Sequence, residues 1–351
     1  MAPKVFLTGA TGYVGGNVLF ALVEAHPDWE YTCLVRNADK GAKVAASYPK
    51  IRLVYGTLDS TDLLEEEAGK ADIVYHTAES SDHVASAEAF AKAAAKRAPS
   101  SPLFYIHTSG TGVLGWETTE KNAYGTELPR IYNDWDGIKE LTSIPDSASH
   151  RDVDKIVLRM SSTNPQAVKT AIVCPPCIYG PGRGPDNQRS IQVYEAAKAI
   201  LERKQAFLPL KGENVWHEVN VDDLSDLFKL LGEAAAAGGG KATWNEDGYY
   251  FAEHREFVWK DIFQSIAKIA KQKGLIESDE TPSLPADELT KLHPAGLYIW
   301  ASNSRGKAIR ARKLLGWECR GKSLKEDLPE IVEREARALG LIEGHAAKVT
   351  K

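Results

Sequence analysis

The sequence is poor in several features that would each point to a particular class of protein. Only four cysteines occur in 351 residues, which is too few for a disulfide scaffold and favours a reduced, cytoplasmic protein. No apolar run approaches the roughly 18 residues needed to span a bilayer, and the N-terminus lacks a signal-peptide pattern, so we expect no membrane association. Lys and Arg (43) do not outnumber Asp and Glu (48), which argues against nucleic-acid binding.

The first half of the chain alternates short apolar runs with helical patterns. Between the runs, helices are expected after Gly12 and at about 59–68, 82–97 and 150–161. This alternation predicts an α/β fold with a doubly wound parallel sheet of the Rossmann type, covered by helices on both faces. The expected strands are Lys4–Thr8, Tyr31–Val35, Ile51–Tyr55, Ile73–His76, Leu103–His107 and Thr170–Cys174.

A glycine-rich turn follows the first expected strand directly. Gly9, Gly12 and Gly15 have the spacing G-x-x-G-x-x-G between a strand and a helix. Here the first glycine permits a tight turn, the second a close approach to a pyrophosphate, and the third close packing of helix on sheet. The helix N-terminus adds free N–H groups and a partial positive charge, so we predict a dinucleotide site. The predicted site also includes Thr11, Tyr13 and Val14, which are neighbours of the three glycines in the sequence.

Further motifs, in the same order, resemble the short-chain dehydrogenase/reductase superfamily in its extended and atypical branches, which include the NAD-dependent epimerases and dehydratases. The resemblance covers about residues 3–335. It implies a bound NAD or NADP, a small-molecule substrate and, as in many members, a homodimer. The motifs are T-G-A-T-G-Y-V-G at 8–15, V-Y-H-T-A at 74–78, Y-G-P-G at 179–182, H-E-V-N-V-D-D-L at 217–224 and S-N-S-R-G-K at 302–307.

The second half of the chain is less regular. Residues 175–185 are rich in Pro and Gly and are expected to form a loop. We expect residues 1–175 to form the NAD(P)-binding Rossmann core. Residues 176–351 would complete that core with about 215–240 and form a smaller substrate lobe from about 176–214 and 241–320. Further elements are expected at about 189–203, 222–236, 258–272 and 324–339 (helices) and 216–221 (a strand).

The end of the second strand distinguishes NAD from NADP. An acidic residue there holds the ribose 2′-hydroxyl, whereas Arg accommodates a 2′-phosphate. Arg36 takes this position and Lys40 follows closely, so we predict NADP, with NAD as the alternative and Asp39 as the alternative ribose ligand. The resemblance implies further cofactor contacts from Leu58, Asp59, Thr77, Ala78, Lys155, Pro175 and Ile178.

The catalytic Ser of the family is replaced in this chain. Members of the family place a Ser at the end of the fifth strand to polarise a substrate carbonyl. Alignment of the hydroxyl-rich run puts Gly110 at that position, flanked by Ser109 and Thr111. Either hydroxyl is therefore a candidate catalytic group, and the alternative is that Ser109 and Thr108 only satisfy backbone groups near the sheet edge.

The catalytic Tyr and Lys of the family form a Y-x-x-x-K motif, and no such motif occurs in the expected region. The best match places Lys155 at the Lys position and Arg151 at the Tyr position, with His150 beside it. Arg keeps its proton near neutral pH, whereas an imidazole, with an unperturbed pKa of about 6.5, can donate one. Tyr132, Tyr179 and water are alternative donors, and His150 could instead only start a helix.

These observations support a hypothesis of NADP(H)-dependent oxidoreductase activity, with hydride transfer to or from a carbonyl-type small molecule. The missing Tyr leaves a non-catalytic NADP-sensing regulatory protein as a second hypothesis. The C-terminal motifs leave a sugar-nucleotide epimerase or dehydratase as a third, although Arg36 and the absent Tyr argue against it. No metal is predicted, because the nine His residues show no metal-binding spacing.

Overall fold

The computed structural model describes residues 2–342. Its centre is a seven-stranded sheet of order β11-β7-β5-β4-β1-β2-β3, and every neighbouring pair is parallel. The predicted Rossmann-type α/β fold is therefore confirmed, and each strand expected in the first half is present. The strands are β1 (Lys4–Thr8), β2 (Glu30–Val35), β3 (Arg52–Tyr55), β4 (Ile73–His76), β5 (Leu103–Thr108), β7 (Val168–Cys174) and β11 (Tyr249–Phe251).

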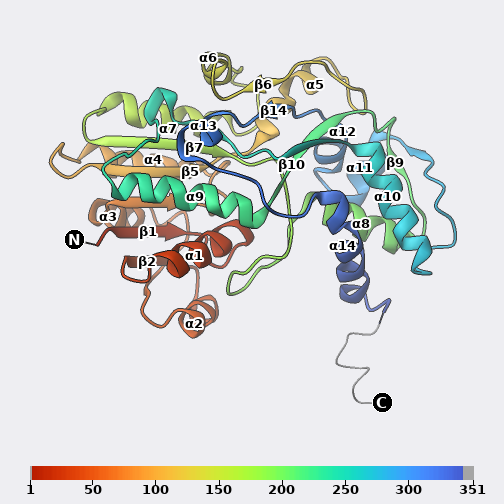
Figure 1. The fold of residues 1–351 in the computed structure, drawn as a ribbon, viewed down its shortest axis with the longest axis horizontal. Helices are drawn as coiled ribbons and strands as arrows, with labels where there is room; N and C mark the ends of the chain where they lie inside the picture. Colours follow the sequence, from red (N-terminus) through yellow and green to blue (C-terminus); the bar gives the residue numbers. More distant parts are fainter. Residues whose placement is uncertain (1, 343–351) are drawn as a thin grey trace.

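Helices cover both faces of this sheet (Figure 1). On one face, α1 (Tyr13–Ala25) packs against α9 (Val221–Ala236), which also contacts β4 and β5. On the other face, α4 (Val84–Ala95) packs between α3 (Thr61–Lys70) and α7 (Arg151–Thr163). The change of face between β1 and β4 is the point at which doubly wound sheets open a ligand cleft.

Of the short elements that were not expected from the sequence, three adjoin the sheet or the glycine turn. Helix α2 (Ala38–Ser47) follows β2, and the Asn37 side chain caps it by accepting a hydrogen bond from the Lys40 N–H at 3.0 Å. Strand β8 (Cys177–Tyr179) corrects the expectation of a continuous loop at 175–185. It contains no proline and pairs in parallel with β10 (Val215–Asn220). Strand β11 is the third, and its three residues are too few for a periodic pattern.

A second lobe lies beside the sheet (Figure 1). Its own apolar core is enclosed by α8 (Gln192–Arg203), α10 (Trp259–Gln272) and α14 (Leu324–Ala338), close to their expected positions. All four cysteines are free thiols. Within residues 2–342, no helix has the length and apolarity required to cross a bilayer.

The remaining elements are short and connect these units. They are η1 (Thr111–Gly115), α5 (Trp116–Glu120), β6 (Tyr132–Asn133), α6 (Ile138–Thr142), β9 (Leu208–Pro209), η2 (Asn245–Asp247), β12 (Arg255–Val258), β13 (Ser283–Leu284), α11 (Ala286–Leu292), α12 (Gly296–Ala301), β14 (Gly306–Lys307) and α13 (Arg310–Leu315).

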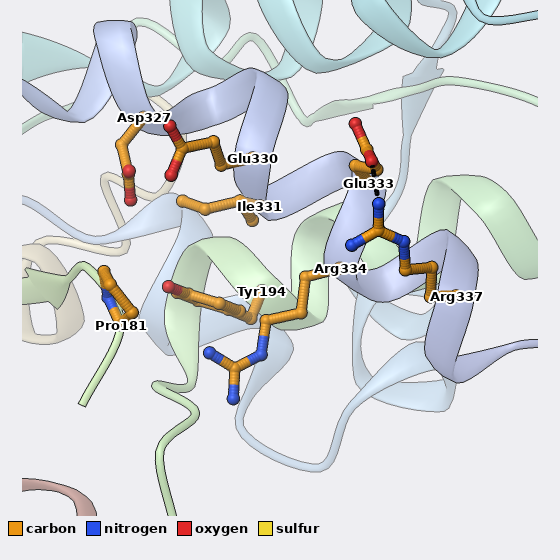
Figure 2. Close-up of a pocket in the computed structure, with 8 residues that line it drawn as sticks. All are labelled: Pro181, Tyr194, Asp327, Glu330, Ile331, Glu333, Arg334 and Arg337. Atoms are coloured by element: carbon orange, nitrogen blue, oxygen red, sulfur yellow. Dashed lines mark hydrogen bonds and ion pairs between the residues drawn. The ribbon is translucent and has the colours of Figure 1, made fainter. Parts of the chain in front are cut away.

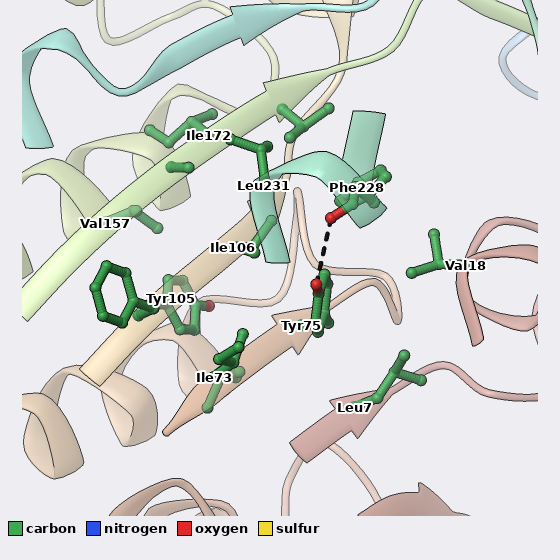
Figure 3. Close-up of a cluster of buried hydrophobic side chains, with 14 of the residues drawn as sticks. Leu7, Val18, Ile73, Tyr75, Tyr105, Ile106, Val157, Ile172, Phe228 and Leu231 are labelled. Carbon is green, nitrogen blue, oxygen red and sulfur yellow. Dashed lines mark hydrogen bonds between the residues drawn. The ribbon is translucent and has the colours of Figure 1, made fainter. Parts of the chain in front are cut away.

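The contact between the sheet and α9 depends on one tyrosine (Figure 3). Tyr75 of β4 is fully buried, and its hydroxyl donates a hydrogen bond to the Phe228 carbonyl of α9 at 3.2 Å. A Cβ atom added at Gly232, one turn further along α9, would lie 1.8 Å from that hydroxyl oxygen. Glycine at 232 is therefore required by the space that Tyr75 occupies.

We predict that Gly232→Ala destabilises the protein by about 1–3 kcal/mol through overpacking, although alanine gains roughly 1 kcal/mol in helix propensity. Urea denaturation of the wild type, Gly232→Ala, Tyr75→Phe and the double variant measures this. Removing the hydroxyl should recover part of the loss, so the two changes should be strongly non-additive. Additive effects would show that Tyr75 does not cause the constraint.

Candidate functional site

The main cavity opens at the carboxyl ends of β1, β2 and β4, where the chain changes face. Its volume is about 630 Å³, within the usual range for small-molecule and cofactor sites. The lining comes from the glycine turn, the ends of β2 and β4 and the segments after β3 and β8. The lining residues are Gly9, Thr11, Gly12, Leu34, Arg36, Lys40, Thr57, Leu58, Asp59, Thr77, Ala78, Glu79, His83 and Asn187.

The glycine turn forms the base of this cavity. Gly9 has φ +87°, in the left-handed region, and its carbonyl accepts the Gly12 N–H at 2.8 Å. A Cβ atom at Gly15 would lie 2.2 Å from the Thr77 hydroxyl oxygen, so only glycine lets α1 approach β4 this closely. Gly12 caps α1 without a side-chain hydrogen bond, which leaves the first N–H groups of the helix available to a phosphate.

Most residues predicted to contact the cofactor are brought together here, but some lie outside the cavity lining. Tyr13 donates its hydroxyl to the Gly180 carbonyl at 2.6 Å, and Val14 is partly buried in the apolar core. Pro175 lies beside η1, where its carbonyl accepts the Thr111 N–H at 3.0 Å, and Ile178 belongs to β8. The lining residues that the sequence did not suggest are Leu34, Thr57, Glu79, His83 and Asn187.

The cationic side chains of the cavity lie at the end of β2. Arg36 is exposed there, and Lys40 follows on the first turn of α2. Lys40 forms an ion pair with Asp186, which comes from the loop after β8. Two cations beside a glycine cradle suit a ligand that carries several phosphates.

Helix α7 corrects the expected positions of Lys155 and Arg151. Lys155 faces outward, and its Nζ lies 2.7 Å from Asp146 Oδ2 on the exposed surface. Arg151 is buried, and its guanidinium donates to the carbonyls of Thr142 and Ile144, at 2.9 Å for Ile144. Neither cation is therefore directed at the end of β5. Arg151 binds carbonyl groups of the loop that precedes α7, and Lys155 binds a surface carboxylate.

His150 precedes the first residue of α7, and its ring lies at the end of β5, beside Gly110 and Gly112. It caps α7 with φ +66°, and its Nδ1 lies 2.7 Å from Asp82 Oδ1. This hydrogen bond lowers the pKa of the Asp82 carboxyl. A Cβ atom at Gly110 or Gly112 would lie 3.2 or 3.0 Å from His150 Nε2, so the glycine at the family Ser position makes room for the imidazole.

A buried polar layer lies behind His150. Asp154, one turn after His150 on α7, accepts the Tyr249 hydroxyl at 3.0 Å, and its Oδ1 lies 3.8 Å from His107 Nε2. Burial raises the pKa of Asp154 and lowers the pKa of His107 to about 3. Burial therefore disfavours the charged form of both groups.

The two candidate hydroxyl residues lie at the end of β5. Ser109 and Thr111 are buried, and neither hydroxyl has a hydrogen-bond partner among the described residues. The alternative tyrosines are already engaged: the Tyr179 hydroxyl donates to the Lys322 carbonyl, and the Tyr132 hydroxyl accepts the Trp116 indole N–H at 2.9 Å. Neither residue lines the cavity, so their contact with a substrate stays a prediction from the sequence.

Two other features are separate from this cavity. A cavity of about 350 Å³ in the second lobe is lined by Tyr194 and by charged residues of α14, of which Glu333 and Arg337 pair with each other (Figure 2). The ligand atoms of Asp223, His254 and Cys319 lie within 4.8 Å of one another. The Asp223 carboxylate already accepts backbone N–H groups of residues 320 and 321, which explains its burial without a metal.

Comparison with known proteins supports this description of the fold. The sequence model of the NAD dependent epimerase/dehydratase family matches residues 5–245. A protein named oxidase ucsJ, from an Acremonium species, is 36% identical over 97% of this chain and 100% of its own length. Among solved structures, a UDP-glucose 4-epimerase from Thermotoga maritima has a TM-score of 0.64 at 16% identity, covering 96% of this chain and 99% of that chain.

A second solved structure has the same fold. The dTDP-glucose 4,6-dehydratase from Bacillus anthracis, in complex with NAD, also has a TM-score of 0.64 at 16% identity and covers 96% of this chain and 97% of that chain. At this identity the two structural neighbours show the fold alone.

The buried imidazole of His107 predicts sensitivity to acid. Its pKa is about 3 in the folded protein and about 6.5 in an unfolded chain, so between these values only the unfolded state takes up the proton. This contribution to stability is complete above about pH 6.5 and is lost as the pH falls towards 3. In urea titrations from about pH 7 to 4, His107→Asn should lose stability less steeply than the wild type. Equal slopes would contradict this.

Proposed function

Since the chain belongs to the NAD dependent epimerase/dehydratase family, in the extended branch of the short-chain dehydrogenases/reductases, we propose that it is an NADP(H)-dependent oxidoreductase acting on a carbonyl-type small molecule. A bound nicotinamide dinucleotide supplies or accepts the hydride. One observation carries the proposal: the glycine turn and two cations, Arg36 and Lys40, line the same cavity, a combination that suits a phosphorylated dinucleotide.

The dinucleotide would be held by groups that the cavity already presents. The N–H groups at the start of α1 would bind the pyrophosphate, and the Gly9–Gly12 turn leaves room for it. Arg36 and Lys40 would hold the 2′-phosphate, since a guanidinium matches phosphate geometry with two parallel hydrogen bonds. Leu58 and Asp59 would contact the adenine.

His150 would exchange the substrate proton that the family assigns to Tyr. Its Nδ1 lies 2.7 Å from the Asp82 carboxylate, and an Nδ1–H donated there would fix the orientation of the ring. Nε2 then faces the glycines at 110 and 112 and would pass its proton to the substrate oxygen. The hydroxyls of Ser109 and Thr111 would orient that oxygen.

The relative named oxidase ucsJ supports redox chemistry for this chain, because it matches almost the whole length. The epimerase and dehydratase neighbours support only the fold, and the chain lacks the Tyr that those reactions need in the family. We therefore favour net oxidation or reduction of a substrate over sugar-nucleotide isomerisation.

We predict that Arg36→Ala weakens NADPH binding by about tenfold to a hundredfold, because a charge-assisted hydrogen bond contributes about 1.5–3 kcal/mol. NADH affinity should change little. Fluorescence titration of both cofactors measures the two dissociation constants. Arg159→Ala, on the exposed face of α7, is the matched control and should leave both unchanged. Equal weakening of NADH and NADPH would contradict a contact with the 2′-phosphate.

We predict that His150→Gln lowers kcat for NADPH-dependent carbonyl reduction by about 10²–10⁴-fold, the usual contribution of general acid catalysis. NADPH affinity should persist, since His150 does not line the cavity. NADPH oxidation would be followed across a panel of aldehydes, ketones and quinones. His26→Gln, at the end of α1, is the control. A wild type inactive on the whole panel would count against the oxidoreductase, and an active His150→Gln against this donor.

A further inference from the structure

The loop after β8 lies across the glycine turn. Residues 181–189, which we call the strap, donate hydrogen bonds from two of their backbone N–H groups to α1 and to the turn. The Arg183 N–H donates to Asn17 Oδ1 at 2.7 Å, and the Asn187 N–H donates to the Thr11 carbonyl at 3.2 Å. One end of the strap is therefore held by the same segment that forms the base of the cavity.

Close packing fixes this end of the strap further. A Cβ atom at Gly184 would lie 2.7 Å from the Gly16 Cα, so the two backbones are in direct contact. The Arg183 guanidinium lies 4.2 Å from the centre of the Phe20 ring and pairs with Asp222 at 3.0 Å. The strap has little freedom to move relative to α1.

The strap reaches α2 through a single carboxylate. Asp186 forms ion pairs with the ammonium groups of both Lys40 and Lys43, and its side chain is only 12% exposed. These two hydrogen-bonded cations lower the pKa of Asp186, so it is ionised near neutral pH. Lys40 also lines the cavity beside Arg36 and Asn187. One ammonium thus belongs both to the cavity wall and to the strap.

A phosphate beside Arg36 would compete for this ammonium. A phosphate monoester carries between one and two negative charges near neutral pH, about as much as Asp186 or more. Lys40 has three N–H donors and can contact both anions, but its one positive charge cannot neutralise both of them. A ligand without that phosphate leaves the Lys40–Asp186 pair undisturbed.

We propose, on the basis of the function proposed above, that Asp186 is a specificity-determining residue that competes with the adenosine 2′-phosphate for Lys40. Asp186 lowers the affinity for NADP and leaves the affinity for NAD unchanged. It therefore reduces the preference for NADP over NAD that Arg36 creates. The adenosine end of the cavity is then tuned by a residue 146 positions away from its partner in the sequence.

Two small probes isolate this end of the cofactor from the nicotinamide. They are 2′,5′-ADP, which carries the 2′-phosphate, and 5′-AMP, which lacks it, both titrated calorimetrically into the full chain. Asp186→Asn should bind 2′,5′-ADP about two- to fivefold more tightly, the effect of one partly exposed ion pair, with 5′-AMP unchanged. The gain should shrink as salt is raised, since screening weakens both contacts.

Asp222→Asn is the matched control, because it removes the ion pair that Arg183 of the strap makes and leaves Lys40 and Lys43 alone. If Asp222→Asn raises the affinity for 2′,5′-ADP as much as Asp186→Asn does, a looser strap explains the higher affinity and the proposal is wrong. Lys40→Met is a second variant: it should weaken 2′,5′-ADP and remove most of the gain from Asp186→Asn. An undiminished gain in that background would also overturn the proposal.

The outcomes separate this inference from the proposed function. Binding of 2′,5′-ADP to the wild type with no change in Asp186→Asn refutes the role of Asp186 alone. Absence of binding by both probes refutes the proposed NADP site and, with it, the competition for Lys40.

Discussion

The site depends on how closely α1 approaches the sheet at its first turn. A side chain at Gly15 would collide with the Thr77 hydroxyl, which in turn bonds to the Thr8 carbonyl at 2.6 Å. Displacing α1 would also move Tyr13, whose hydroxyl binds Gly180, and the strap that packs against the same helix. The phosphate cradle, the cavity and the strap therefore all follow from one contact that only glycine permits.

At the end of β5, the absence of a side chain at Gly110 allows the His150 imidazole to lie where it does. The sequence predicts Gly110 at the family Ser position, and a Cβ atom there would lie 3.2 Å from the His150 Nε2, a tight contact. The two departures from the family pattern are therefore coupled, because a Ser at 110 would crowd the imidazole. Arg151 completes the arrangement by holding the preceding loop through the Ile144 carbonyl, which sets where α7 begins.

The parts of the molecule that could be predicted from the sequence are those fixed by local patterns. The strands, the glycine turn and Arg36 at the end of β2 follow from periodicity and spacing within a few residues. Lys155 was placed wrongly because the register of α7 depends on tertiary bonds of Arg151. Asp82 and Asp186 meet partners 68 and 146 residues away, and no local signal marks such pairs.

Positive and negative side chains lie at different strands around the cavity, and each group suits a different part of the proposed chemistry. Arg36 and Lys40 belong to the β2 side, and Glu79 and Asp82 follow β4, with β1 between the two strands. Phosphates require the first arrangement, whereas the second supplies the Asp82 carboxylate that contacts the His150 imidazole. A carboxylate moved to the β2 side would repel the phosphates that Arg36 attracts. Two carboxylates are already there, and both are paired: Asp186 with Lys40 and Lys43, and Asp59, which follows β3, with His83 at 3.3 Å. Only the Asp186 pair involves a cation of the cavity wall, so this carboxylate is the one whose removal should alter phosphate binding.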